Sequence, residues 1–147
     1  MHQIFYVDDD IDDIDMFKYA VNALEREKGI KIDLHVFGDG NNFINHIAAN
    51  NIAFSPIFLD INMPGRNGFS ILEEIKQQPR LEKMPVIMFS TSDSPDIISK
   101  SKMLGADFYA IKPSDFREMN HIIYNVLNIS PNNDKADAES FVLNKKV

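Results

Sequence analysis

The 147-residue sequence contains no cysteine. This absence excludes disulfide bonds, zinc sites built on thiolates and catalysis by a thiol, and it fits a cytoplasmic protein. Long hydrophobic runs are also missing, since none approaches the ~20 residues that a membrane span needs. The N-terminus begins with a strand pattern rather than with a basic segment followed by a long apolar one. We therefore expect neither a signal peptide nor contact with a membrane.

Positive charge is scarce as well. The chain has 15 Lys and Arg residues against 22 Asp and Glu residues, which gives a formal net charge of −7. A net negative charge argues against a nucleic-acid-binding surface. Apolar residues make up 44% and charged residues 25%, which is ordinary for a soluble globular protein. The length is enough for one domain with a sizeable core, and we see no internal repeat.

Five short, mostly apolar runs predict strands, and a helical pattern follows each of them. The first helix carries Ile14, Phe17, Val21 and Leu24 on one stripe and ends near Gly29. The other helices are indicated by Phe43, Ile44, Ile47 and Ala48, by Phe69, Ile71, Leu72 and Ile75 after Asn67, by residues 95–104 between Ser94 and Gly105, and by Phe116, Met119, Ile122, Ile123, Val126 and Leu127. The strand runs are Ile4–Val7, Ile32–Phe37, Ile57–Leu59, Pro85–Phe89 and Phe108–Ile111.

Strands that alternate with helices predict an α/β fold with one five-stranded parallel sheet and helices on both faces, a three-layer sandwich. Only the second run, residues 32–37, alternates between apolar and polar residues, as expected for a strand at an edge. The predicted strand order is therefore 2-1-3-4-5, the flavodoxin-like order. From Ser130 the chain turns polar, so we divide it into a domain over 1–129 and a flexible tail over 130–147. In that tail we expect frayed chain with at most one helical turn around Phe141.

Four of the strands end in polar residues that carry chemistry: Asp8 and Asp9, Asp60, Ser90, and Lys112. Right-handed crossovers place these strand ends on one rim of the sheet, so the groups converge. Carboxylates so close repel one another unless a cation intervenes, and Mg²⁺ prefers oxygen ligands. A metal ion, a lysine and a hydroxyl around Asp60 suit a carboxylate that accepts a phosphoryl group. The alternative is that Asp60 merely caps the turn that follows it.

These residues together resemble the receiver domain of two-component response regulators, the CheY-like family, over residues 3 to 128. Five separated elements carry the resemblance: Val7-Asp8-Asp9, Leu59-Asp60, Met63-Pro64 with Gly68, Ser90, and Lys112-Pro113.

The resemblance implies that Asp60 accepts phosphoryl from a phosphohistidine on a sensor histidine kinase or a histidine phosphotransfer protein. It implies that Asp9, Asp60 and the backbone carbonyl of Asn62 bind Mg²⁺, with Asp8 acting through water. Ser90 and Lys112 would bind phosphoryl oxygens. Tyr109 matches the aromatic switch residue, although it could also be plain core. The Lys112–Pro113 peptide resembles the family's cis bond.

The acidic run after Asp9 has a simpler explanation, because Asp10, Asp12, Asp13 and Asp15 suit the start of a helix, where the helix dipole favours negative charge. Two other functions share parts of the pattern. A flavodoxin-like FMN carrier needs a phosphate loop after the first strand, where this chain has three aspartates. A haloacid-dehalogenase-type phosphatase wants a second acid at position 62, which is Asn.

No output domain is expected in 147 residues. The protein is therefore predicted to act through reversible contacts, as a monomer or a weak phosphorylation-dependent dimer. It would either bind a downstream target when phosphorylated or pass the phosphoryl group on. A degenerate receiver that only binds partners is a third possibility, which the full residue set makes the least favoured.

Overall fold

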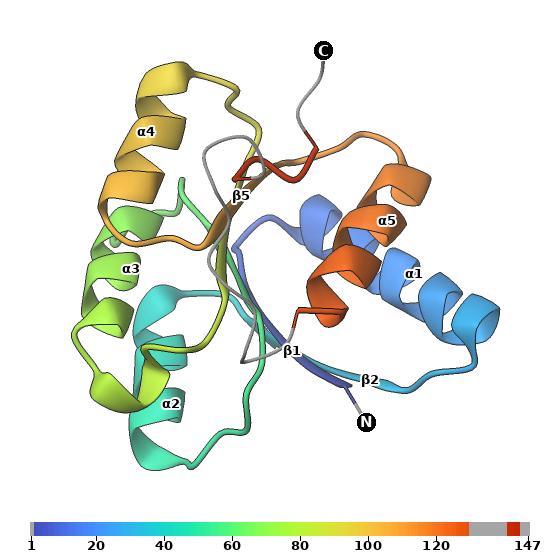
Figure 1. Cartoon of the computed structure of the whole chain (residues 1–147), viewed down its shortest axis with the longest axis horizontal. Coiled ribbons are helices and arrows are strands. Elements are labelled where there is room, and N and C mark those ends of the chain that lie inside the picture. The colour runs from blue at the N-terminus through green and yellow to red at the C-terminus, as the bar shows by residue number, and fades with distance from the viewer. Residues whose placement is uncertain (1, 130–140, 145–147) are drawn as a thin grey trace.

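A parallel five-stranded sheet runs through the middle of the molecule (Figure 1). The structure is a computed structural model, and it describes residues 2–129 and 141–144. The strands are β1 (His2–Val7), β2 (Ile32–Phe37), β3 (Ile57–Asp60), β4 (Val86–Ser90) and β5 (Phe108–Ile111). The helices are α1 (Ile11–Lys28), α2 (Gly40–Ala49), α3 (Gly68–Lys76), α4 (Pro95–Met103) and α5 (Phe116–Leu127), with a short 3₁₀ turn, η1 (Pro79–Leu81).

The strands lie in the order β2-β1-β3-β4-β5, and every neighbouring pair is parallel. This confirms the predicted order and the edge position of residues 32–37. The order places β3 at the centre of the sheet, between β1 and β4. Since the strands are parallel, their carboxyl ends share one rim, and Asp60 stands in the middle of that rim as the last residue of β3.

Helices cover both faces of the sheet, which confirms the three-layer sandwich. Figure 1 shows α2, α3 and α4 on one side and α1 and α5 on the other. Side chains alternate between the two faces along each strand. In β1, Phe5 and Val7 join the core under α2, α3 and α4, whereas Ile4 and Tyr6 join the core under α1 and α5. All four are fully buried, so both layers are held by apolar contact.

Several predicted helix boundaries are confirmed. The side chain of Asn67 accepts a hydrogen bond from the Ser70 N–H (3.1 Å), which caps α3. Gly29 ends α1 with a φ of 63°, a left-handed conformation that glycine adopts without strain. Ser94 stands at the N-cap position of α4, as predicted, but its hydroxyl makes no capping hydrogen bond. No helix in the part of the chain that is described is long and apolar enough to cross a bilayer.

The structure corrects two expectations. The Lys112–Pro113 peptide, like every peptide bond within the described ranges, is trans rather than cis; trans is the intrinsically favoured isomer even before proline. Residues 141–144 do not form a helical turn. They pair with β5 through a parallel bridge between Tyr109 and Val142, because β5 offers an open edge that a helical turn would leave unpaired. The rest of the predicted tail, residues 130–140 and 145–147, lies outside the described residues.

Candidate functional site

Polar side chains from four strand ends meet at the rim of the sheet. Asp8 and Asp9 follow the last residue of β1, Asp60 ends β3, Ser90 ends β4, and Lys112 follows β5. Each strand is a short apolar run that stops where its neighbours stop, so the residues that come next are brought together. The sequence predicted this convergence from strand order alone, and the geometry confirms it for the acids and the lysine.

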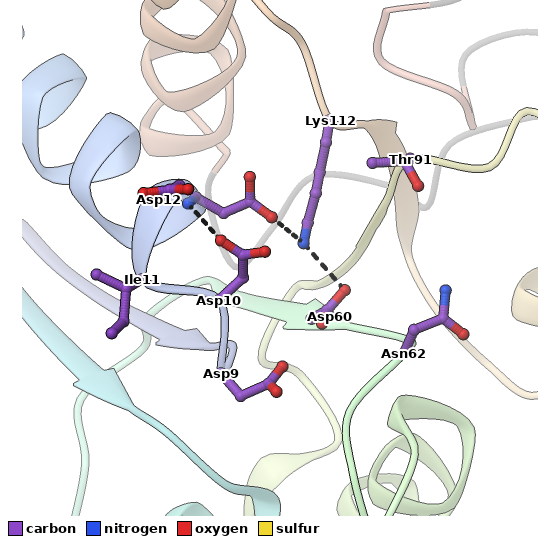
Figure 2. A pocket seen from close by; sticks show the side chains of 9 residues that line it. Asp9, Asp10, Ile11, Asp12, Asp60, Asn62, Thr91 and Lys112 are labelled. Carbon is purple, nitrogen blue, oxygen red and sulfur yellow. Dashed lines mark hydrogen bonds and ion pairs between the residues drawn. The ribbon is translucent and has the colours of Figure 1, made fainter.

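Lys112 connects three carboxylates. Its Nζ lies 2.9 Å from an oxygen of Asp8, 2.8 Å from one of Asp13 and 3.1 Å from one of Asp60. Its side chain is only 8% exposed. Figure 2 shows the lysine reaching from the end of β5 towards Asp60. Burial lowers the pKa of Lys112, but the hydrogen bonds with Asp13 and Asp8 and the negative charges of Asp60 and Asp8 together raise it by more, so the amine carries its charge.

Asp8 is fully buried at the base of the site. The Tyr6 hydroxyl donates to one of its oxygens (2.5 Å), and the Asp10 N–H donates to the other (3.0 Å). Burial, and then the neighbouring Asp8, raise the pKa of the Tyr6 hydroxyl, so it stays protonated and acts as a donor. These bonds and Lys112 hold the Asp8 carboxylate in one orientation.

The carboxylates of Asp8, Asp9 and Asp60 each offer an oxygen, and these oxygens lie within 4.8 Å of one another. Asp9 is exposed, whereas the other two are buried. Three hard oxygen donors at this spacing, open to water on one side, suit a divalent cation such as Mg²⁺ or Mn²⁺. Asp9 and Asp60 open into a cavity of about 720 Å³, and Asp8 lies buried beside them. Figure 2 draws the lining of the cavity: Asp9, Asp10, Ile11, Asp12, Asp13, Asp60, Asn62, Thr91 and Lys112.

Asp60 is held in an environment that penalises its charge. Burial raises the pKa of its carboxyl, Lys112 lowers it, and Asp8 raises it again, with a net value of about 7. The side chain is 6% exposed. A carboxylate in this position gains from any further cation placed against it, which is the electrostatic condition for a metal-assisted site.

The raised pKa predicts how stability depends on pH. In the unfolded chain Asp60 titrates near 3.8, and in the folded, metal-free protein near 7. The folded state therefore binds more protons between about pH 4 and pH 7, and its stabilisation is lost as the pH rises through that window. Asp60→Asn removes the group that ionises, so the variant should not lose stability through this window. We expect the variant to be more stable than wild type at pH 8, on the order of 4 kcal/mol, and nearly equal to it near pH 4.

Urea unfolding of both proteins with a chelator present, from pH 4 to pH 8, measures the difference. If the difference in free energy of unfolding between Asp60→Asn and wild type is the same at pH 4 and pH 8, the pKa of Asp60 is not raised in the folded protein. Asp12→Asn, which alters an exposed acid of the same cavity, is the control and should give no such trend.

Ser90 and Tyr109 are buried and are not among the residues that line the cavity. The Ser90 oxygen accepts a hydrogen bond from the Ser92 N–H (3.2 Å). The Tyr109 ring is fully buried, and its hydroxyl donates to the Ser92 carbonyl (2.7 Å). Asp60 pairs with Phe89 in the sheet, so Ser90 stands one residue beyond that pair, at the same rim as the end of β3.

Sequence reasoning missed two residues of this site. Tyr6 reads as a core position of β1, and only its fixed place two residues before Asp8 could have suggested a bond to that carboxylate. The sequence predicts Asp13 as a helix-dipole residue, and it does lie in the first turn of α1. It also contacts Lys112, 99 positions away, and only the position of α1 over the rim reveals this. Asp10 is the N-cap of α1, as its residue type suggests.

Comparison with known proteins agrees with this geometry. Residues 4–124 match the model of the response regulator receiver domain. Among curated proteins, the chain is 30% identical over 91 residues to the two-component response regulator ARR16 of Arabidopsis thaliana, which covers 62% of this chain and 56% of that protein. It is 35% identical over 63 residues to the response regulator Rcp1 of Synechocystis, covering 43% of each. The match therefore spans about half the length of these relatives.

Solved structures share the fold. The phosphorylated cyanobacterial phytochrome response regulator RcpA superposes with a TM-score of 0.73 at 27% identity, covering 87% of this chain and 96% of that one. The Mn²⁺-bound form of Rcp1 superposes with a TM-score of 0.73 at 24% identity, covering 88% and 98%.

Proposed function

Because the chain belongs to the response regulator receiver domain family, we propose that it accepts a phosphoryl group on Asp60 from a sensor histidine kinase or a histidine phosphotransfer protein. The observation that carries the proposal is the place of Asp60. It ends the central strand, it opens into the cavity, and it lies against Lys112 at 3.1 Å with Asp8 and Asp9 beside it. RcpA, a relative of the same fold, is known in a phosphorylated form.

In the transfer step, a carboxylate oxygen of Asp60 attacks the phosphorus of a phosphohistidine. The new oxygen–phosphorus bond forms as the phosphorus–nitrogen bond breaks, and the electron pair stays on the donor's imidazole, which takes up a proton. Lys112 pairs with a phosphoryl oxygen, and Ser90 donates its hydroxyl to another. The product is an acyl phosphate, and its added negative charge lies next to the Lys112 ammonium.

Asp9, Asp60 and the backbone carbonyl of Asn62 would hold Mg²⁺, with Asp8 acting through water. The ion would neutralise charge on the acids and on the phosphoryl oxygens during transfer. The donor set supports this role, because three carboxylates within 4.8 Å match a hard dication. Asp8 in particular is fixed from behind by Tyr6 and Lys112, so one acid of the site is already oriented.

The protein then acts as a phosphoacceptor that assists its own phosphorylation and dephosphorylation, rather than as an enzyme that turns over a substrate. Phosphorylation switches binding through Ser90 and Tyr109. We place this activity in the cytoplasm, with a protein partner downstream, as a monomer or a weak phosphorylation-dependent dimer that contacts neither nucleic acid nor membrane. The FMN-carrier and phosphatase alternatives are disfavoured, because acids fill the site where the first needs a phosphate loop and position 62 is Asn.

Asp60→Asn should abolish labelling. We expect wild type, incubated with Mg²⁺ and acetyl phosphate or a phosphorylated kinase, to gain the mass of one phosphoryl group, and Asp60→Asn to gain none, because an amide cannot form the acyl phosphate. Intact-protein mass spectrometry reads this directly. Asp12→Asn is the matched control, since Asp12 lines the same cavity but is exposed, and it should label as wild type does. Equal labelling of Asp60→Asn and wild type would refute the assignment.

A further inference from the structure

We propose that Phe141–Asn144, the docked segment, is a regulatory strand: it binds the outer edge of β5, holds Tyr109 buried, and favours phosphorylation at Asp60, which in turn favours docking. The coupling rests on the proposed function of Asp60. The docking rests on contacts that are independent of it. In Figure 1 the docked segment lies beside β5, between the layers that contain α4 and α5.

The docked segment completes the hydrogen bonding of an edge strand. β5 is the last strand in the sheet order, so one side of it faces no other named strand. On that side the Tyr109 N–H donates to the Phe141 carbonyl (2.9 Å), and the Leu143 N–H donates to the Tyr109 carbonyl (2.9 Å). These bonds form a parallel bridge between Val142 and Tyr109, which pairs the docked segment with β5.

Asn144 extends the pairing with its side chain. Its amide oxygen accepts from the Ile111 N–H (2.9 Å), and its amide nitrogen donates to the Ile111 carbonyl (2.7 Å). The backbone N–H and carbonyl groups of Tyr109 and Ile111 point away from β4, towards the open edge of the sheet. The docked segment supplies hydrogen-bond partners for the backbone groups of both residues. An asparagine is suited to this, because one amide group supplies both the acceptor and the donor.

Apolar contact adds to these bonds. Phe141 is 3% exposed and belongs to the same core cluster as Tyr109, with Val142 packed against that cluster. The Lys102 ammonium of α4 stands 5.5 Å from the centre of the Phe141 ring. The docked segment is therefore anchored by a buried aromatic side chain as well as by the strand edge, and it covers the region of the core that contains the Tyr109 ring.

A chain of contacts leads from the docked segment to the phosphorylation site. The Tyr109 hydroxyl bonds to the Ser92 carbonyl, and the Ser92 N–H bonds to the Ser90 oxygen. A cleft of about 710 Å³ joins the same two regions, with Phe141 and Val142 in its lining together with Thr91 and Lys112. Lys112 also lines the cavity of Asp60. The cleft beside the docked segment and the cavity of Asp60 therefore have Thr91 and Lys112 in common.

The coupling follows from a single two-state element, the Tyr109 ring. A docked Phe141 packs in the same core cluster as the buried Tyr109 ring, so docking favours the inward ring. A phosphoryl group on Asp60 draws the Ser90 hydroxyl towards it, which also favours the inward ring. Two events that favour one state must favour each other by the same factor. Loss of docking should therefore weaken phosphoryl binding, and phosphoryl binding should tighten docking.

The experiment compares full-length wild type with Asn144→Ala and with the double variant Phe141→Ala/Asn144→Ala. Hydrogen exchange followed by NMR reports docking through the Tyr109, Ile111 and Leu143 amides. Titration with beryllofluoride and Mg²⁺ reports binding of a phosphoryl mimic. We expect the double variant to lose protection at those amides and to bind beryllofluoride about fivefold more weakly, at the lower end of typical couplings. In wild type, beryllofluoride should slow exchange at Leu143.

Asn125→Ala on the exposed face of α5 is the control and should match wild type. Amides of α5 report whether the variants keep their fold. Asn144→Ala alone leaves Phe141 in place, so it should lower amide protection and beryllofluoride affinity by less than the double variant does. Unchanged protection at Tyr109 and Ile111 in the double variant would refute docking. Lost protection with unchanged beryllofluoride affinity would refute the coupling while leaving the docking intact. If neither wild type nor the variants bind beryllofluoride or label with acetyl phosphate, the function proposed for Asp60 fails, and the coupling fails with it.

Discussion

Lys112→Met should remove most phosphorylation and, at neutral pH without metal, much of the stability of the fold. Lys112 is the shared partner of Asp8, Asp13 and Asp60, two of which are buried. Removing one partner of a buried ion pair leaves an uncompensated charge and costs about 3–5 kcal/mol. Loss of one positioned charge at a reacting group slows transfer by about 10²–10³.

The pH dependence of the stability loss in Lys112→Met distinguishes the effect of the lysine charge from the effect of its packing. Burial raises the pKa of the Asp60 carboxyl, so this group takes up a proton as the pH falls towards 4, and the loss of stability in Lys112→Met should shrink. Mg²⁺ should also restore part of it, because the ion supplies another positive charge to the same acids. Urea unfolding at pH 4 and pH 8, with and without Mg²⁺, measures both effects. If Lys112→Met lowers the free energy of unfolding equally at both pH values, with and without Mg²⁺, the packing of the Lys112 side chain matters rather than its charge.

Two variants serve as controls for this prediction. Lys83→Met replaces an exposed lysine that precedes β4, at the opposite end of that strand from Ser90, and should change the free energy of unfolding by less than about 0.5 kcal/mol. Lys112→Arg keeps the charge with a different shape, so it should recover stability more fully than it recovers phosphorylation. Mass spectrometry with acetyl phosphate gives the labelling rates of all three.

The parts of the fold that follow from short-range patterns were predictable from the sequence. Residues 57–59 and 85–89 read as strands because they are short apolar runs with turns after them, and the structure has strands at 57–60 and 86–90. The alternation of residues 32–37 identified the edge strand. Once the order is known, the meeting of Asp8, Asp60 and Lys112 follows from parallel topology alone.

The parts that depend on distant contacts were not predictable. The pairing of residues 141–144 with β5 requires a contact 33 positions away, between Tyr109 and Val142, and a run of three apolar residues after a polar stretch carries no local sign of it. The Asp13–Lys112 pair has the same character, since an acid in the first turn of a helix is already explained by the helix dipole. The bond from Tyr6 to Asp8 was hidden because an aromatic residue in a buried strand needs no further explanation.

Gly68 links the fold to the site, and Gly68→Ala should disrupt both. A Cβ at position 68 would stand 2.2 Å from the Asp60 carbonyl oxygen and 2.9 Å from the Ile61 Cα, both of them backbone atoms that cannot turn aside. The start of α3 is held against this loop by the Gly68 N–H, which donates to the Ile61 carbonyl (2.9 Å). The glycine is therefore required by close approach, since any side chain pushes α3 away from the strand end that presents Asp60.

We expect Gly68→Ala to lower the free energy of unfolding by about 3 kcal/mol, at the upper end of overpacking effects. We also expect it to slow phosphorylation of the remaining folded protein by about 10²-fold, because a shift of about 1 Å in a reacting group has that effect. Gly38→Ala is the matched control: a Cβ there meets no atom within 4 Å, so unfolding should change by less than about 0.5 kcal/mol. Asn67→Ala removes the cap of α3 without adding bulk, and it should cost only about 1 kcal/mol and leave the labelling rate within a factor of a few. Similar results for Gly68→Ala and Gly38→Ala would show that α3 can shift without moving Asp60.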